Sequence, residues 1–390
     1  MSFSSRSEID DTPSPLAREL EAVRMSPGGH IDLTLSNPTR AGLPYELYAP
    51  VWEKLRRAVA GYEPDPLGLL SARQAVVRHW PGQPAAARAD RVLLVPSSSD
   101  AYDYVFTLLC DEGDGVLVPE PSYPLLAHIA RYAQVELQPY RLSYDGAWHI
   151  DFDSVRHARS PRTRAIVLVS PNNPTGSYTS SREFRELSAL GLPIVSDEVF
   201  SRYPLTERAG RVQSALGATD CLTFAIDGLS KSAGLPQLKL GWYGVSGPDA
   251  AVDEAMRRAS WLADTYLPVA TPVQAVLPEL LECAAAFREP LLARLRGNFA
   301  RLATQLDGSA ATLLASEGGW YALIRLPALA SEEDWVLGLA RERGVLSQPG
   351  YYYDLATDAP HLVLSLLPPE ETFARGARAI HLEVERRLAL

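Results

Sequence analysis

Apolar and polar positions divide the chain into two zones with different periodicity. In the first zone, residues 91–263, short runs of consecutive apolar residues alternate with segments of helical period. Continuous apolar runs are typical of parallel strands covered on both faces, so this zone predicts an α/β domain with a mostly parallel sheet. The predicted strands are Val92–Val95, Gly115–Val118, Ala165–Val169, Pro193–Asp197, Cys221–Ile226 and Leu238–Ser246.

The second zone, after residue 263, has a different order of elements. A long helical stretch extends from Thr265 towards Leu306 and predicts a helix that bridges two domains. Strands and helices of ordinary length then alternate, which is typical of an α+β domain. The predicted elements are strands at 318–325 and 361–367 and helices at 332–343 and 370–387.

The length of the chain fits two such domains. With 390 residues, of which 46% are hydrophobic and 22% charged, the chain has the composition of a globular protein with a large core. The predicted division is an N-terminal arm with part of the small domain at 1–45, a large domain at 46–280 and a small C-terminal domain at 281–390.

Charge and cysteine content exclude several classes of partner. The formal net charge of -10 argues against nucleic acid and anionic membranes. The 3 cysteines lie far apart and form no metal-binding pattern, and such a sparse, odd count is typical of a reducing cytoplasm. The start has no signal-peptide core, and no run of about 18 apolar residues occurs, so the sequence predicts a soluble cytoplasmic protein.

A loop of small residues follows the predicted strand Cys221–Ile226 and carries Lys231. Its glycines, serines and alanine leave room for a flat group beside the amine, and a second cation, Lys239, follows. A lysine that is partly desolvated near another cation has a lowered pKa, which favours the neutral amine that forms Schiff bases. The loop therefore suits an aldehyde with a phosphate tail.

Further loops after predicted strands carry candidate binding residues. Ser97–Ser99 precede a helix, where N–H groups, hydroxyls and the helix dipole favour an anion, although capping alone needs one serine. Tyr123, held between two prolines, can stack on a flat ring or serve only in packing. Asn173 lies in a turn. Asp197 ends a strand, where a carboxylate can pair with a protonated ring nitrogen or act only as a turn residue.

The segment Ser230–Trp242 has the order Ser-Lys-x-x-Gly-Leu-Pro-x-x-basic-x-Gly-Trp. Preceded by the Asn-Asn-Pro-Thr-Gly turn at 172–176 and the Asp-Glu-Val-aromatic segment at 197–200, it resembles the class I/II, fold-type I, pyridoxal-phosphate (PLP) aminotransferases. The resemblance covers most of the chain, from the segment near Ile31 to the final helix. It implies a large α/β domain with a mostly parallel seven-stranded sheet, a small α+β domain, and a homodimer with the active site at its interface.

The resemblance also implies roles for individual residues. Lys231 forms the Schiff base with PLP and then acts as the general base that moves a proton. Asp197 pairs with the ring nitrogen, Asn173 donates to the phenolate oxygen and Tyr123 stacks on the ring. The further cofactor-binding residues that it implies are Ser98, Ser99, Ser230, Lys239 and, reaching the phosphate from the neighbouring subunit, Tyr62.

Four positions depart from the family pattern. Gln237 stands where a small residue or glycine is common. Lys239 stands where the family usually has an arginine, so a phosphate would meet a point charge instead of a bidentate fork. Phe200 stands where a tyrosine hydroxyl usually helps to stabilise the phenolate. Val363 takes the place of the arginine that grips the substrate carboxylate. The candidates for contact with that carboxylate are then Asn37, Arg40 and Arg325.

These features predict an aminotransferase that moves an amino group from an amino acid or amine to a 2-oxo acid in a ping-pong reaction. The expected partners are small molecules and a second copy of the chain. Two alternatives stay open. A PLP-dependent C–S lyase that works by β-elimination would use the same residues, because the cofactor supplies the chemistry. A non-catalytic PLP-binding regulator would keep the lysine without turnover.

Overall fold

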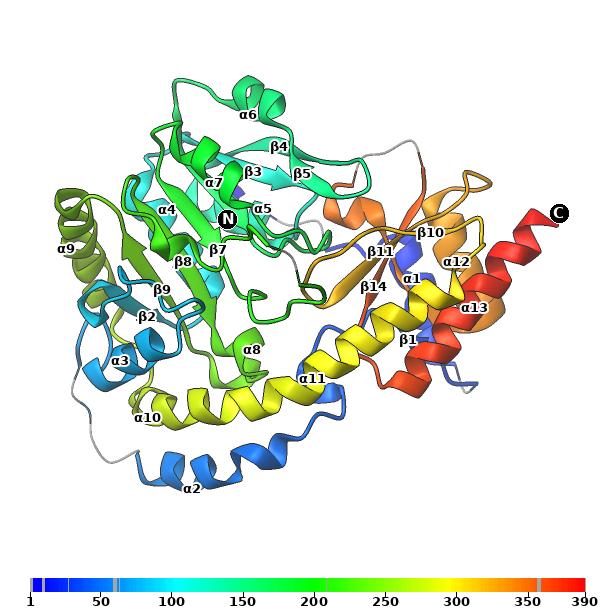
Figure 1. Cartoon of the computed structure of the whole chain (residues 1–390), viewed down its shortest axis with the longest axis horizontal. Helices are drawn as coiled ribbons and strands as arrows, with labels where there is room; N and C mark the ends of the chain where they lie inside the picture. Colours follow the sequence, from blue (N-terminus) through cyan, green and yellow to red (C-terminus); the bar gives the residue numbers. More distant parts are fainter. Residues whose placement is uncertain are drawn as a thin grey trace.

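The computed structural model describes residues 3–8, 11–26, 28–58, 62, 64–207, 209–355 and 359–389. Two sheets lie side by side along the longest axis of the molecule, the larger one to the left in Figure 1 and the smaller one to the right. Helix α11 (Leu277–Gln305) runs beneath both sheets and joins their two halves (Figure 1). The predicted bridging helix is therefore present, although its first part is a separate short helix, α10 (Thr271–Ala275).

The large sheet has eight strands within the described residues, one more than the seven predicted. The extra strand forms an antiparallel hairpin with the strand before it, at one edge of the sheet. β8, β7, β6, β3 and β4 run parallel to one another, as the apolar runs predict. In spatial order the strands are β2 (Val92–Val95), β9 (Gly241–Ser246), β8 (Thr223–Gly228), β7 (Ile194–Asp197), β6 (Thr163–Val169), β3 (Gly115–Glu120), β4 (Glu136–Tyr144) and β5 (Trp148–Ile150).

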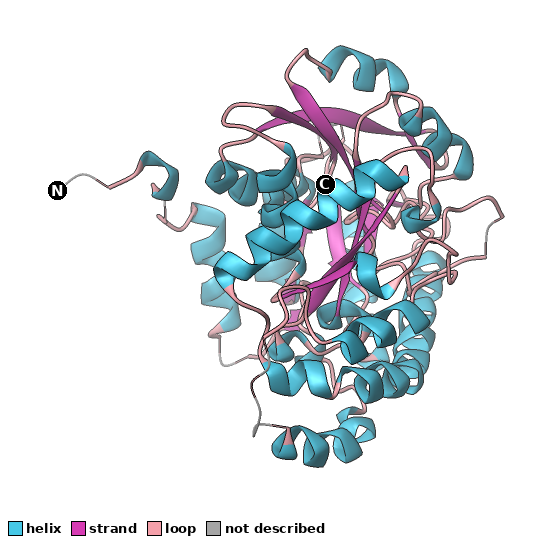
Figure 2. Cartoon of the chain, turned by 90° about the vertical axis from the view of Figure 1, so that its left-hand side faces the viewer, coloured by secondary structure: helices cyan, strands magenta, loops and turns pink. Residues whose placement is uncertain are grey.

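Helices cover both faces of this sheet, so most residues of its central strands are buried (Figure 2). Alternate residues of β6 show the two layers: Val167 packs in a cluster with α4 (Ser98–Leu109), α5 (Leu125–Ala133) and α9 (Asp249–Tyr266). Ile166 packs in a second cluster, with α6 (Phe152–Ala158) and α7 (Ser181–Ser188). Burial on both faces explains why these strands have no polar alternation.

The small sheet is antiparallel, and it receives part of the N-terminal segment. Its strands, in spatial order, are β10 (Thr312–Leu313), β11 (Tyr321–Arg325), β14 (His361–Ser365) and β13 (Gln348–Pro349). Beside it, β1 (Ile31–Asp32) pairs with β12 (Val345–Leu346). The helices around it are α1 (Pro15–Arg24), α12 (Glu332–Arg343) and α13 (Glu370–Leu388).

The remaining helices lie near the ends of the long helix α11. They are α2 (Ala49–Arg57), α3 (Leu70–Arg78) and the one-turn α8 (Leu229–Ser232). Helix α2 ends at Arg57, and residues 59–61 and 63 lie outside the described part of the chain. In that described part, no helix is both long and apolar enough to cross a bilayer, and no cluster of His, Cys, Asp and Glu has the arrangement of a metal site.

Candidate functional site

Four predicted site residues follow four neighbouring parallel strands. Tyr123 follows β3, Asn173 follows β6, Asp197 ends β7 and Lys231 follows β8. The strands are adjacent in the order β8, β7, β6 and β3, and their carboxyl ends therefore meet at one edge of the sheet. Crevices at that edge are where open α/β sheets bind their ligands.

The backbone around Lys231 is held by side chains from three other parts of the chain. Lys231 lies in α8, a single helical turn that is too short to satisfy all of its own carbonyl groups. Each of four consecutive carbonyl oxygens accepts a hydrogen bond from a different side chain. The donors are Tyr203 to Lys231 at 2.5 Å, Arg288 to Ser232 at 2.7 Å, Tyr48 to Ala233 at 2.7 Å and Tyr45 to Gly234 at 2.5 Å. We call these four donors the carbonyl collar.

The amine of Lys231 lies among aromatic rings and opposite a carboxylate. Its Nζ is 5.7 Å from the ring centre of Phe200 and 5.2 Å from that of Trp320. Burial lowers the pKa of the Lys231 amine, and the negative charge of Asp197 partly offsets the effect. The environment therefore favours a neutral, nucleophilic amine, as the sequence predicts.

Asp197 has both carboxylate oxygens fixed. Oδ1 accepts from the backbone N–H of Val199 at 3.1 Å, and Oδ2 accepts from the hydroxyl of Tyr102 at 3.1 Å. Burial raises the pKa of Asp197 to about 6, against the opposing effects of these two donors and of Lys231. Tyr102 was not singled out from the sequence, because its position in α4 suggests only a packed helix residue.

Asn173 has a side chain that is available to a ligand. It is 6% exposed, and its Oδ1 has no hydrogen-bond partner among the described residues. The turn is instead held by Asn172, which donates to the carbonyl of Pro121 at 3.2 Å and accepts from the Thr175 hydroxyl at 2.9 Å. A buried amide with an unused acceptor costs free energy unless a bound group satisfies it, so this feature fits a cofactor in the crevice.

At the start of α4, one serine caps the helix and the next two are left available to an anion. Ser97 is the capping residue, because its hydroxyl accepts from the N–H of Asp100 at 3.2 Å. The alternative that the serines serve capping alone thus accounts for Ser97 only. Ser98 and Ser99 occupy the first two helical positions, where N–H groups point out of the helix end.

Two glycines bring the other predicted phosphate-binding residues to this helix end. A side chain at Gly241 would come within 3.0 Å of the Ser97 carbonyl carbon, and one at Gly228 within 3.0 Å of the Gly241 Cα. The segments that carry Ser230 and Lys239 therefore pass close to the start of α4. Lys239 itself is exposed and has a positive φ of 46°. Sequence and structure together fit a phosphate at this end of the crevice.

The other predicted residues are less tightly placed. Tyr123 is 49% exposed, and the neighbouring Ser122 N–H donates to the carbonyl of Tyr353 at 3.0 Å. Tyr62 is 64% exposed on a segment whose neighbours lie outside the described residues. Asn37 is exposed, and its Oδ1 accepts from the N–H of Thr39 at 3.0 Å.

Neither candidate arginine takes the place of the family arginine at Val363. Val363 is fully buried between Leu323 and Gln348 on the neighbouring strands. Arg325 pairs in register with His361, further along β14, and its side chain is exposed. Arg40 is also exposed, at the end of the turn Pro38–Arg40. The structure therefore does not gather the candidate substrate-binding cations around Val363.

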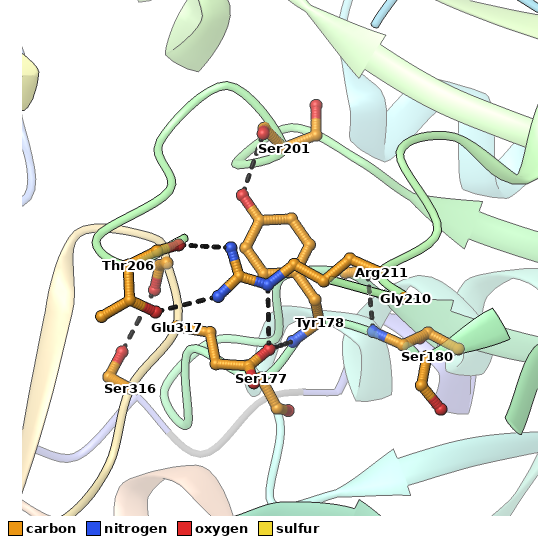
Figure 3. Close-up of polar contacts among 12 residues, drawn as sticks. Ser177, Tyr178, Ser180, Ser201, Thr206, Gly210, Arg211, Ser316 and Glu317 are labelled. Carbon is orange, nitrogen blue, oxygen red and sulfur yellow. Dashed lines mark hydrogen bonds and ion pairs between the residues drawn. The ribbon is translucent and has the colours of Figure 1, made fainter. Parts of the chain in front are cut away.

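A cluster of polar contacts fastens the segment before β11 to two loops of the large sheet (Figure 3). Arg211 Nε lies 3.3 Å from Glu317 Oε2, and the Arg211 guanidinium lies 4.6 Å from the ring centre of Tyr178. Glu317 also accepts from the N–H of Tyr178 at 3.2 Å, and Tyr178 donates from its hydroxyl to the carbonyl of Ser201 at 2.9 Å. This clasp leads directly into Trp320, which borders the Lys231 amine. Sequence reasoning missed it, because its members are distant along the chain.

Known proteins share this fold and sequence pattern. The structure superposes on alanine aminotransferase from Pyrococcus furiosus with a TM-score of 0.87, at 21% identity over 99% of this chain and 100% of that chain. An aminotransferase from Escherichia coli gives a TM-score of 0.85, at 23% identity over 99% and 98% of the two chains. At these identities the likeness shows the fold, and it confirms the predicted fold class.

Comparison of sequences shows the family as well as the fold. Glutamate-pyruvate aminotransferase AlaA of Haemophilus influenzae is 28% identical over 344 residues, or 84% of each chain. Nicotianamine aminotransferase B of Hordeum vulgare is 28% identical over 311 residues, or 75% of this chain and 56% of that protein's length. Residues 54–380 match the family described as aminotransferase class I and II. The chain therefore belongs to the class I and II aminotransferases, enzymes that use pyridoxal phosphate, as the sequence predicts.

Proposed function

We propose that this chain catalyses transamination with Lys231 as the residue that bonds to PLP and moves the proton. The observation that carries the proposal is the meeting of Lys231, Asp197 and Asn173 at the ends of three adjacent strands. When bound, PLP supplies an electron sink for negative charge on the donor carbon. The lowered pKa of the Lys231 amine suits both nucleophilic attack and later work as a general base.

The other residues hold and tune the cofactor. Asp197 would pair with the ring nitrogen, and the side-chain N–H of Asn173 would donate to the phenolate oxygen. Tyr123 would cover one face of the ring. Phe200 offers no hydroxyl on the opposite side of the site, and its ring instead forms part of the apolar wall beside the Lys231 amine.

The phosphate would be bound at the start of α4. The residues proposed there are Ser98, Ser99, Ser230 and Lys239, with Tyr62 from a second copy of the chain. Free N–H groups and hydroxyls at a helix end bind anions without a full countercharge, so one exposed lysine is enough to complete the site.

The substrates are proposed to be an amino donor and a 2-oxo acid acceptor. Relatives are named for glutamate, pyruvate, alanine and nicotianamine, which includes donors of very different size. Because Val363 offers no charge, we propose that a substrate carboxylate is held by backbone donors and by Asn37 or Arg40, or that the donor is an amine without an α-carboxylate.

Assembly and compartment complete the proposal. We propose a homodimer, because the family resemblance assigns Tyr62 to the phosphate of a neighbouring copy. We also propose the predicted boundary near residue 280, which falls within α11. The sparse cysteines suit the reducing cytoplasm.

Reductive trapping of the cofactor tests the proposal sharply, because the chain has lysines only at 54, 231 and 239. Purified protein is incubated with PLP, reduced with borohydride and mapped by peptide mass. Label on Lys231 is expected, and label only on Lys54 or Lys239 would contradict the proposal.

Donor tests then identify the reaction. Alanine, glutamate and cystathionine are supplied without an acceptor. Conversion of the cofactor to its amine form with release of a 2-oxo acid is expected. Pyruvate plus a thiol from cystathionine, with no amine form from any donor, would instead identify a C–S lyase.

A further inference from the structure

Tyr102 makes a polar contact that no part of the proposed reaction yet uses. Its side chain is 6% exposed, and its ring packs against Phe106 with centres 5.9 Å apart. Its hydroxyl lies 3.1 Å from Asp197 Oδ2. A buried phenol could have satisfied itself at a backbone carbonyl, as Tyr140 does at Val167. Tyr102 instead donates to the carboxylate of Asp197, the last residue of β7.

The two hydrogen bonds to Asp197 come from different parts of the chain, one from a near neighbour in sequence and one from a distant helix. The Val199 N–H fixes Oδ1 from the same loop, which holds the carboxylate at the strand end but leaves it free to turn. The Tyr102 hydroxyl fixes Oδ2 from α4, and the pair of contacts determines the plane of the carboxylate. A carboxylate with a defined plane presents its lone pairs in a defined direction.

Helix α4 connects this contact with the proposed phosphate site. Ser98 and Tyr102 are four positions apart on α4 and therefore lie on one face of the helix. A helix is rigid over one turn, so the distance between the anion site at Ser98 and the bond at Asp197 is fixed by backbone geometry. The same helix thus places both ends of a ligand that carries a phosphate and a ring.

We propose that Tyr102 is a positioning residue that keeps Asp197 ionised and directed at the ring nitrogen of the cofactor. This inference rests on the proposed role of Asp197. Burial raises the pKa of the Tyr102 phenol well above its ordinary value, so the phenol stays a donor. Its bond favours the charged form of Asp197, which burial disfavours.

The charged groups around Asp197 explain why the hydrogen bond from Tyr102 matters for the ionisation of this carboxylate. The Lys231 amine also favours the carboxylate, but burial lowers the pKa of the amine and so disfavours its charged form. Asp227, whose pKa burial raises to about 6, faces Asp197 and is itself opposed by that charge. Tyr102 and the Val199 N–H are neutral donors. Their effect on the ionisation of Asp197 therefore does not depend on whether Lys231 is charged.

The direct test follows Asp197 in the protein without cofactor. Aspartate is labelled with carbon-13 at the carboxyl, and the Asp197 signal is assigned as the one that Asp197→Asn removes. The midpoint of its titration is expected to rise by about one pH unit in Tyr102→Phe, since a hydrogen bond to a charged group is lost. Tyr140→Phe, which removes a buried hydroxyl of the same kind, should leave the midpoint unchanged. An unshifted midpoint in Tyr102→Phe would overturn the proposal.

The second measurement uses the protein with its cofactor. Tyr102→Phe should weaken PLP binding and lower kcat about tenfold, the equivalent of one pKa unit, with KM for the donor unchanged. In an Asp197→Asn background the same substitution should have no further effect, because the group it acts through is gone. Equal losses in both backgrounds would identify Tyr102 as merely structural.

A third measurement covers the case in which Tyr102→Phe does not fold. Tyrosine labelled at the ring ζ carbon in the unsubstituted chain should give one signal that moves with the Asp197 midpoint, and Asp197→Asn should abolish that movement. No such signal would count against the proposal. If wild-type protein binds no PLP at all, the proposed function fails, whereas the Asp197 midpoint still decides whether the Tyr102 bond acts.

Discussion

The two ends of the proposed site are built in opposite ways. At the lysine end, four consecutive carbonyl oxygens are bonded by the collar, and the Lys231 amine lies between Phe200 and Trp320. At the phosphate end, Ser98, Ser99 and Lys239 lie at a helix start and an exposed turn. A group that reacts needs a fixed position and a dry surrounding, whereas a group that is only held can be bound by several weak contacts near water.

Replacing the reacting amine should have the largest effect. Lys231→Ala is expected to reduce kcat by more than about 10³-fold, because it removes both the nucleophile and the general base. Steady-state rates with any accepted donor measure the loss. Lys54→Ala, on the outer surface, is the matched control and should retain full activity. Turnover by Lys231→Ala at the wild-type rate would remove the distinction between the two ends.

Glu198, next to Asp197, is a buried carboxylate that is only partly bonded. It is 2% exposed, and Oε1 accepts from the Ala215 N–H at 2.7 Å, while Oε2 has no partner among the described residues. Burial raises its pKa from 4.5 to about 7. The folded protein thus binds the proton more tightly than the unfolded chain, and the stability that this supplies is complete below pH 4.5 and lost as the pH rises through about 7.

Glu198→Gln should therefore flatten the pH dependence of stability. The free energy of unfolding of the variant, relative to wild type, should improve by about 3 kcal/mol between pH 4.5 and pH 8. Urea unfolding of the cofactor-free protein at several pH values measures this. Glu254→Gln is the control, because the pKa of Glu254 is lowered to about 2 by Arg257 and Arg258 and its effect lies below this range. Parallel curves for Glu198→Gln and wild type would show that Glu198 does not titrate there.

Removal of one collar hydroxyl should have a moderate effect. Tyr203→Phe removes the side-chain donor to the Lys231 carbonyl, which is expected to cost about 0.5–1.5 kcal/mol of unfolding free energy. Tyr243→Phe is the control, because its buried hydroxyl has no partner among the described residues and its loss should cost little. If the two variants are equally stable, the collar bond at Tyr203 contributes nothing to the lysine end.

The smallest effect is expected at Lys239. Lys239→Ala should weaken PLP binding by up to about fivefold, since exposed charge pairs contribute less than about 1 kcal/mol, and the loss should shrink in high salt. Lys239→Arg should restore binding or improve it, because arginine adds bidentate bonds. Equilibrium titration with PLP at two salt concentrations checks both. If Lys239→Ala instead reduced PLP affinity by as large a factor as Lys231→Ala reduces kcat, the phosphate end would not be the weakly held one.

Apolar runs were a good guide to the central strands and a poor one to the edge. The runs at 92–95, 165–169 and 221–226 lie in β2, β6 and β8 because these strands are buried on both faces. β4 and β5 escaped notice, because β4 is an outer strand with exposed and buried positions mixed along it. β5, the eighth strand, has only three residues, and one of them is buried.

The sequence by itself determined which groups would stand at the strand exits. Parallel strands place their carboxyl ends at one edge, so Tyr123, Asn173, Asp197 and Lys231 could be assigned to one crevice from their order along the chain. Only the tertiary structure decided what surrounds them. The collar, the Tyr102 bond and the absence of a cation at Val363 depend on segments far apart in sequence, and packing, which no local period records, decides such contacts.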